Sequence, residues 1–122
     1  MCSPEKIVIT VDIRKNRIRI YKSTLRLMDN PKHVQLLICV PKQTFIIRAV
    51  EKEDPQLQTV RILPNFLSPE SPCEIYSQTF IKKLKEALGN IDSSKSYRLT
   101  GTYLPKQNLT VFPFSTLQEI KN

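Results

Sequence analysis

Six basic side chains lie close together near the start of the chain: Arg14, Lys15, Arg17, Arg19, Lys22 and Arg26. They fall within residues 14–26, which contain no Asp or Glu. Lys and Arg neutralise phosphates and release their counterions, and Arg can also donate paired hydrogen bonds to guanine. The cluster therefore predicts a nucleic-acid-binding site, with DNA as the expected partner. The alternative is a charged strand edge that keeps the sheet from pairing with a neighbouring molecule.

The overall charge favours the first of these interpretations. The 122-residue chain carries a formal charge of +8, and its first 50 residues hold ten Lys and Arg against three acids, whereas residues 51–122 hold nine against eight. A domain this basic often carries an electrostatic footprint for a polyanion. The positive field is concentrated in the first half, where the cluster lies.

No other constellation points to catalysis, a metal or a cofactor. His33 is the only histidine, and the three cysteines are far apart in the sequence: Cys2, Cys39 and Cys73. This set lacks the spacing of a zinc site or of a nucleophile beside a base. Glycine occurs only at Gly89 and Gly101, so a glycine-rich phosphate loop is excluded. We expect no enzyme activity, no cofactor and no small-molecule substrate.

Localisation follows from the apolar runs and the start of the chain. No run approaches the roughly 18 apolar residues that a membrane-spanning helix needs, and the first residues lack the layout of a secretory signal. Three unpaired cysteines suit a reducing compartment. We therefore expect a soluble cytoplasmic protein with no membrane contact, folded as one domain over residues 1–122.

The basic cluster lies on a predicted β-hairpin. Apolar residues alternate at period two over residues 7–13 and again over 17–21, with the polar turn Arg14-Lys15-Asn16 between the two runs. In this phase Ile18 and Ile20 face the core, while Arg17, Arg19 and Tyr21 face solvent. The side chains of Arg17 and Arg19 are therefore expected side by side on one surface.

A short helix and a second hairpin follow. Ser23 or Thr24 can cap a helix of one or two turns that the Asp29-Asn30-Pro31 segment ends. Residues 34–40 and 44–50 are apolar and β-prone, and the turn Pro41-Lys42-Gln43 separates them.

The second half is predicted to repeat this order. A connector with four prolines spans about residues 51–72 and includes a brief strand near 60–63. A strand over 73–76 precedes a helix over 78–88, which Ser77 caps and Gly89 ends. A final hairpin covers residues 97–104 and 109–112.

Two short matches support an internal duplication. The segment Ile20-Tyr21-Lys22-Ser23-Thr24-Leu25 matches Ile75-Tyr76-Ser77-Gln78-Thr79-Phe80, and residues 40–47, which contain Pro41-Lys42-Gln43, match residues 104–111, which contain Pro105-Lys106-Gln107. The alternative is chance similarity between two apolar hairpins. We predict an α+β, mainly β fold: two diverged strand–helix–hairpin repeats, about 6–50 and about 73–114, forming one pseudo-twofold domain.

This order of elements resembles the swapped-hairpin fold of AbrB-type bacterial transcription regulators, and the single-chain duplication is similar to the MraZ arrangement. The resemblance implies a DNA-binding regulator or a mobile-element accessory protein in which Arg17 and Arg19 match DNA-contacting arginines. Two departures stand against it: no Gly precedes Arg17, and Tyr21 stands where Pro is usual. The rival prediction is a protein-interaction module, a homodimer formed through apolar strand edges and three tyrosines: Tyr21, Tyr76 and Tyr103.

Overall fold

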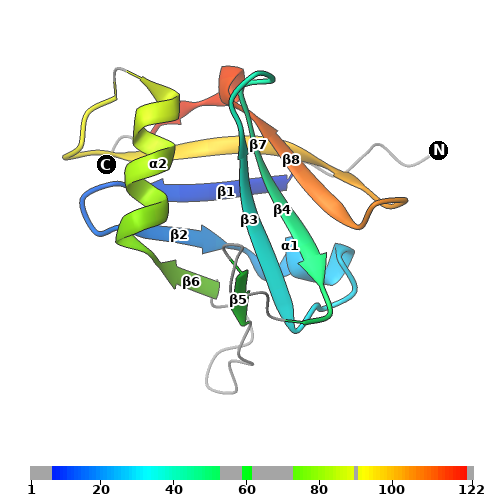
Figure 1. The fold of residues 1–122 in the computed structure, drawn as a ribbon. Coiled ribbons are helices and arrows are strands. Elements are labelled where there is room, and N and C mark those ends of the chain that lie inside the picture. Colours follow the sequence, from blue (N-terminus) through cyan, green and yellow to red (C-terminus); the bar gives the residue numbers. More distant parts are fainter. Residues whose placement is uncertain (1–6, 53–58, 62–72, 90, 121–122) are drawn as a thin grey trace.

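The computed structural model describes residues 7–52, 59–61, 73–89 and 91–120, with the side chains of residues 60 and 61 left out (Figure 1). The predicted connector, about 51–72, lies mostly outside these residues.

The chain begins with the predicted hairpin. Strand β1 (Ile7–Asp12) pairs with β2 (Arg17–Ile20), antiparallel, so that Val11 lies opposite Ile18 and Thr10 opposite Arg19. Ile18 and Ile20 are fully buried and Arg17 and Arg19 are not, which confirms the predicted phase.

Helix α1 (Lys22–Leu27) follows β2 after a single residue, Tyr21. The prediction that Ser23 or Thr24 caps this helix is wrong: Tyr21 holds the cap position without a side-chain hydrogen bond, and both Ser23 and Thr24 lie inside the helix. The strand is too close to the helix to leave room for a separate capping turn. The helix ends as predicted, where Asp29 and Asn30 take left-handed angles, with φ of 62° and 47°.

The second hairpin consists of β3 (His33–Cys39) and β4 (Thr44–Val50), joined by a turn in which Gln43 has φ of 49°. Strand β5 (Thr59–Arg61) pairs with β3 and confirms part of the strand expected near 60–63; residues 62 and 63 lie outside the described part.

The second half also follows the prediction. Strand β6 (Cys73–Tyr76) leads into helix α2 (Gln78–Leu88), where the Ser77 hydroxyl accepts a hydrogen bond from the Phe80 amide over 3.1 Å and Gly89 ends the helix with φ of 88°. Strands β7 (Ser96–Leu104) and β8 (Leu109–Pro113) form the last hairpin. The short 3-10 helix Phe114–Thr116 and strand β9 (Gln118–Glu119) were not predicted.

The strands of the described residues form one antiparallel sheet in the order β5-β3-β4-β8-β7-β1-β2-β6, with β9 beside β7. Strand β7 pairs with β1 through residues 96–101 and with β8 through residues 102–104. The sheet curls, so that β3 and β4 cross in front of β1 and β2 (Figure 1). The fold is mainly β, as expected.

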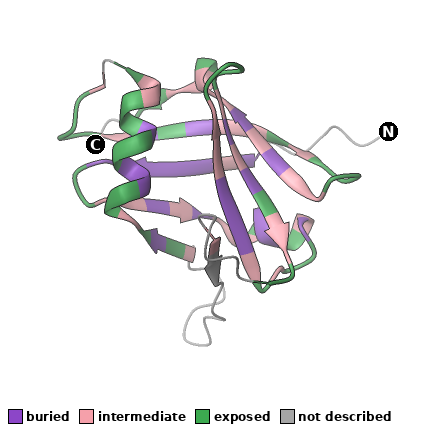
Figure 2. Cartoon of the chain, in the orientation of Figure 1, coloured by how far each residue is buried: buried purple, intermediate pink, exposed green. Residues whose placement is uncertain are grey.

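The core fills the space between the two curled parts of the sheet (Figure 2). Phe45 of β4 is fully buried, and its ring centroid lies 5.3 Å from that of Phe80 in α2 and 5.9 Å from that of Phe112 in β8. Helix α2 therefore covers one open end of the curled sheet with its apolar face. No helix of the described residues has the length and the apolar composition needed to cross a bilayer.

Candidate nucleic-acid interface

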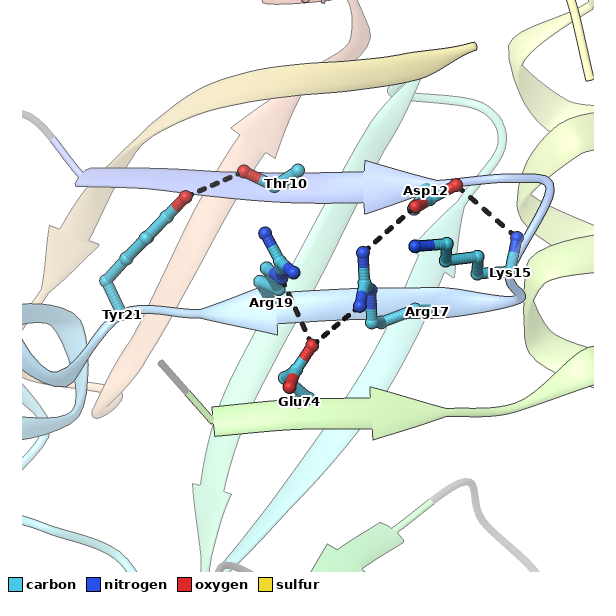
Figure 3. A network of polar contacts seen from close by, with 7 residues as sticks. All are labelled: Thr10, Asp12, Lys15, Arg17, Arg19, Tyr21 and Glu74. Atoms are coloured by element: carbon cyan, nitrogen blue, oxygen red, sulfur yellow. Dashed lines mark hydrogen bonds and ion pairs between the residues drawn. The ribbon is translucent and has the colours of Figure 1, made fainter. Parts of the chain in front are cut away.

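The outward face of β2, β1 and β7 carries the central part of the predicted basic cluster. Arg17 and Arg19 point to the same side of β2, and the side chain of Lys15, from the turn, lies beside Arg17 (Figure 3). On the opposite side of these strands lies the core. One layer of backbone therefore separates the cations from the apolar interior and fixes their spacing.

Arg17 lies between two carboxylates. Its guanidinium donates to Asp12 of β1 over 3.0 Å and to Glu74 of β6 over 2.9 Å, and its side chain is only 12% exposed. A polar contact with Tyr76, and then the charges of Glu74 and Asp12, raise the pKa of Arg17, although burial opposes them. The cluster is thus free of acids along the sequence but not in space.

Arg19 shares one of these acids. Its Nε lies 3.2 Å from the same Glu74 oxygen that Arg17 contacts (Figure 3). The Arg19 side chain is 37% exposed, so it remains accessible to a partner on the outward face. The two arginines and the two carboxylates of this network balance in formal charge, so Arg19 offers the face accessible hydrogen-bond donors rather than excess positive charge.

The other predicted residues lie at the two ends of β2. Arg14 and Lys15 are exposed in the β1–β2 turn, while Lys22 and Arg26 lie on α1 beyond the other end. In the part of the chain that the structure describes, the side chains of Arg14, Lys15 and Arg26 form no ion pair. From the turn to the start of α1 the extended chain covers roughly 20 Å, about the length of six base pairs of duplex.

Sequence reasoning missed one residue of this face, Arg98. Thr10 of β1 lies opposite Arg19 on one side and opposite Arg98 of β7 on the other, so the two arginines flank it in one row across three strands. Arg98 is exposed and forms no ion pair with any described residue. The alternation of buried Tyr97 and Leu99 around it would have shown that it points outward, but not which strand it adjoins.

The tyrosines of the rival prediction lie in different environments. The Tyr21 hydroxyl hydrogen-bonds Thr10 Oγ1 over 2.9 Å, and the Tyr103 hydroxyl lies 3.0 Å from Asn108 Oδ1. Tyr76 at the β6 edge is 63% exposed. Each of the three tyrosines thus has its own surroundings, and of the three only Tyr76 has a largely exposed ring.

The residues considered for metal binding do not gather. Among the described residues no three His, Cys, Asp or Glu side chains lie close enough to hold a metal ion. His33 lies at the start of β3, and Cys39 and Cys73 are not disulfide-bonded.

Comparison with known proteins gave no match: no family model fits the chain, and no curated protein or solved structure is similar to it. The resemblance to AbrB-type regulators stays a hypothesis, and the outward face must be interpreted from its own geometry.

Proposed function

We propose that this protein binds DNA through the outward face of β2, β1 and β7 together with the β1–β2 turn. One observation carries the proposal: Asp12 and Glu74 are both engaged by Arg17, so that the positive charge of Arg14, Lys15 and Arg98 is left without a carboxylate partner in the described residues. Unbalanced cations on one surface release counterions when they meet the phosphate backbone. The proposed role of Arg17 differs from that of the other cations, because it holds the strands together.

The turn cations provide the sharpest test, because the chain offers a matched control. Arg14 and Lys15 lie exposed in one hairpin turn, and Lys42 and Lys106 lie exposed in two others. We expect the double variant Arg14→Gln/Lys15→Gln to bind a random-sequence duplex more weakly, with the slope of log affinity against log salt reduced by about 1.8 for two lost phosphate contacts. The control Lys42→Gln/Lys106→Gln removes the same charge and should leave the slope unchanged.

Fluorescence anisotropy at several salt concentrations measures both quantities. Equal losses in the two double variants would mean that net charge alone attracts DNA and would contradict the proposed surface. A wild-type protein without salt-dependent binding would overturn DNA binding altogether.

We also propose that residues 6–50 and 73–114 are diverged copies of one unit. The strand order supports this: β2 pairs with β6 and β4 with β8, each with its counterpart, and the hairpin pair β3–β4 of the first unit corresponds to β7–β8 of the second. Exchanging the two units leaves this set of pairs unchanged, as a twofold relation requires. Superposing the backbones of the two units in an experimental structure tests the duplication.

With the duplication, the AbrB-type resemblance supports the role of a bacterial transcription regulator or mobile-element accessory protein acting in the cytoplasm. The two copies would contribute unequally, because Glu74 and Tyr76 stand on the strand of the second unit that corresponds to β2. Selection of bound fragments from random duplex DNA tests whether a preferred sequence exists.

The exposed ring of Tyr76 supports the second candidate, a homodimer that pairs through the β6 edge. Exposed aromatic side chains on a strand edge are frequent anchors of protein interfaces. Sedimentation of the wild type and of Tyr76→Ser distinguishes the candidates, because an apolar dimer contact should respond little to salt whereas DNA binding should weaken steeply.

A further inference from the structure

A shallow pocket opens on the outward face next to the row that contains Arg98. Its volume is about 320 Å³, and four of the described residues line it: Val8, Tyr21, Ser23 and Arg98. They come from β1, the β2–α1 junction, α1 and β7, so the pocket joins the proposed DNA-binding face to the start of the first helix.

The lining combines the cation of Arg98, the hydroxyl of Ser23 and a wall formed by Tyr21 and Val8. Arg98 is exposed without an ion pair to any described residue, and Ser23 is exposed in the first turn of α1. The hydrogen bond between the hydroxyls of Tyr21 and Thr10 holds the tyrosine against β1, so its ring and Val8 form one wall of the pocket. None of the described residues that line the pocket carries a carboxylate.

These groups select for one kind of ligand. A guanidinium presents a planar fork of N–H donors that matches two phosphate oxygens, and a serine hydroxyl can donate to a third. A described lining with an arginine and without a carboxylate favours anions over cations, and the open, half-apolar shape can admit the sugar next to a phosphate.

We propose that this pocket binds a single backbone phosphate of nucleic acid, with Arg98 as the paired donor and Ser23 as the second donor. The inference rests on the proposed function, since it names one phosphate contact on the same face. It adds a contact on the sheet that sets how the duplex lies across β1, in addition to the exposed cations of the turn.

Variants of Arg98 and Ser23 separate the contribution of positive charge to DNA binding from the contribution of hydrogen-bond geometry. Arg98→Gln should lower the salt slope by about 0.9, the value of one phosphate contact. Arg98→Lys should keep the slope and still weaken binding, by roughly threefold to tenfold, because an ammonium cannot pair with two oxygens. Ser23→Ala should weaken binding by roughly threefold to tenfold without changing the slope, whereas Ser115→Ala, an exposed serine on the short 3-10 helix, should have no effect.

The proposed phosphate site is wrong if Arg98→Gln keeps the wild-type slope of log affinity against log salt, or if both Arg98→Lys and Ser23→Ala keep the wild-type affinity. Either result would leave the proposal of DNA binding through the turn cations intact. The failure of DNA binding itself is recognised differently, by a wild-type protein that does not bind a duplex at any salt concentration.

A second measurement identifies the source of the phosphate. Amide chemical shifts of Val8, Ser23 and Arg98 are followed while inorganic phosphate, a mononucleotide and a short duplex are added in turn. We expect the duplex to shift these amides at the lowest concentration, because neighbouring cations add to its affinity. If inorganic phosphate or the mononucleotide saturates the shifts at a lower concentration than the duplex, the pocket binds a free phosphate ligand. That result would overturn the proposal that it binds a backbone phosphate of nucleic acid.

Discussion

Arg17 on β2 donates a 3.0 Å hydrogen bond to Asp12 on β1, the residue directly opposite it in the hairpin, and both side chains are nearly buried, at 12% and 11% exposure. The same guanidinium reaches Glu74 on β6, so that one side chain connects three neighbouring strands (Figure 3). Arg17 therefore contributes to stability more than to an open basic surface.

Removal of this side chain should destabilise the fold. Arg17→Ala leaves Asp12 almost buried without a cation, and we expect the free energy of unfolding to fall by about 2–3 kcal/mol. Arg19→Ala removes only an exposed ion pair and should cost less than about 1 kcal/mol. Urea denaturation measures both, and equal losses for the two variants would contradict the structural role of Arg17.

Gly101 lies where β7 passes from β1 to β8, and it is intolerant of a side chain. A methyl group there would meet the Val111 carbonyl oxygen and lie 2.6 Å from the Phe112 ring. We expect Gly101→Ala to lower the free energy of unfolding by about 3 kcal/mol through overpacking. Gly89→Ala meets no atom within 4 Å and should cost only the strain of its positive φ, about 1–2 kcal/mol. Thermal or urea unfolding that ranks the two in the opposite order would rule this account out.

The start of α2 depends on one hydroxyl. Ser77→Ala leaves the Phe80 amide without its acceptor and should lower the free energy of unfolding by about 1 kcal/mol. Ser115→Ala, an exposed serine outside any cap of α2, should change it by less than about 0.5 kcal/mol. A helix that keeps full stability without the Ser77 hydroxyl, as judged by circular dichroism during unfolding, would show that packing of Phe80 alone fixes its start.

The thiol of Cys73 should respond to alkaline pH. Burial, and then the nearby charge of Glu74, raise its pKa above the ordinary value of 9.0, although Lys22 opposes them. The native state therefore holds this proton more tightly than the unfolded chain does. The free energy of unfolding should be unaffected below pH 9.0 and should fall as the pH rises from 9.0 through the folded-state pKa.

Alkylation of a Cys2→Ser/Cys39→Ser variant measures this directly, because it leaves Cys73 as the only thiol. Half-maximal reactivity should require a higher pH than for the same variant unfolded in urea. Identical pH profiles in the two states would show that the folded environment does not hold the proton.

The local elements of this fold follow from the sequence because their signals are local. Ile18 and Ile20 alternate with Arg17 and Arg19, and this period alone separates the buried from the outward side of β2. In the same way Ser77 and Gly89 mark both ends of α2. The α1 cap was predicted wrongly because the distance between β2 and the helix depends on how the strand is placed.

The site was less accessible to sequence reasoning because its partners come from distant strands. Glu74 reaches Arg17 only because β6 pairs with β2, and Arg98 lies in one row with Arg19 only because β1 pairs with both of their strands. Strand pairing over such separations is decided by the packing of the whole core, and no period in one segment reports it.

Strand β7 belongs to both curled parts of the sheet, through residues 96–101 on one side and 102–104 on the other. A continuous strand shared in this way cannot leave one part without pulling apart the other. The amides of Leu99, which faces β1, and of Thr102, which faces β8, should therefore exchange with deuterium at the same slowest rate, the rate of global opening. Neither part of this sheet should therefore unfold separately from the other.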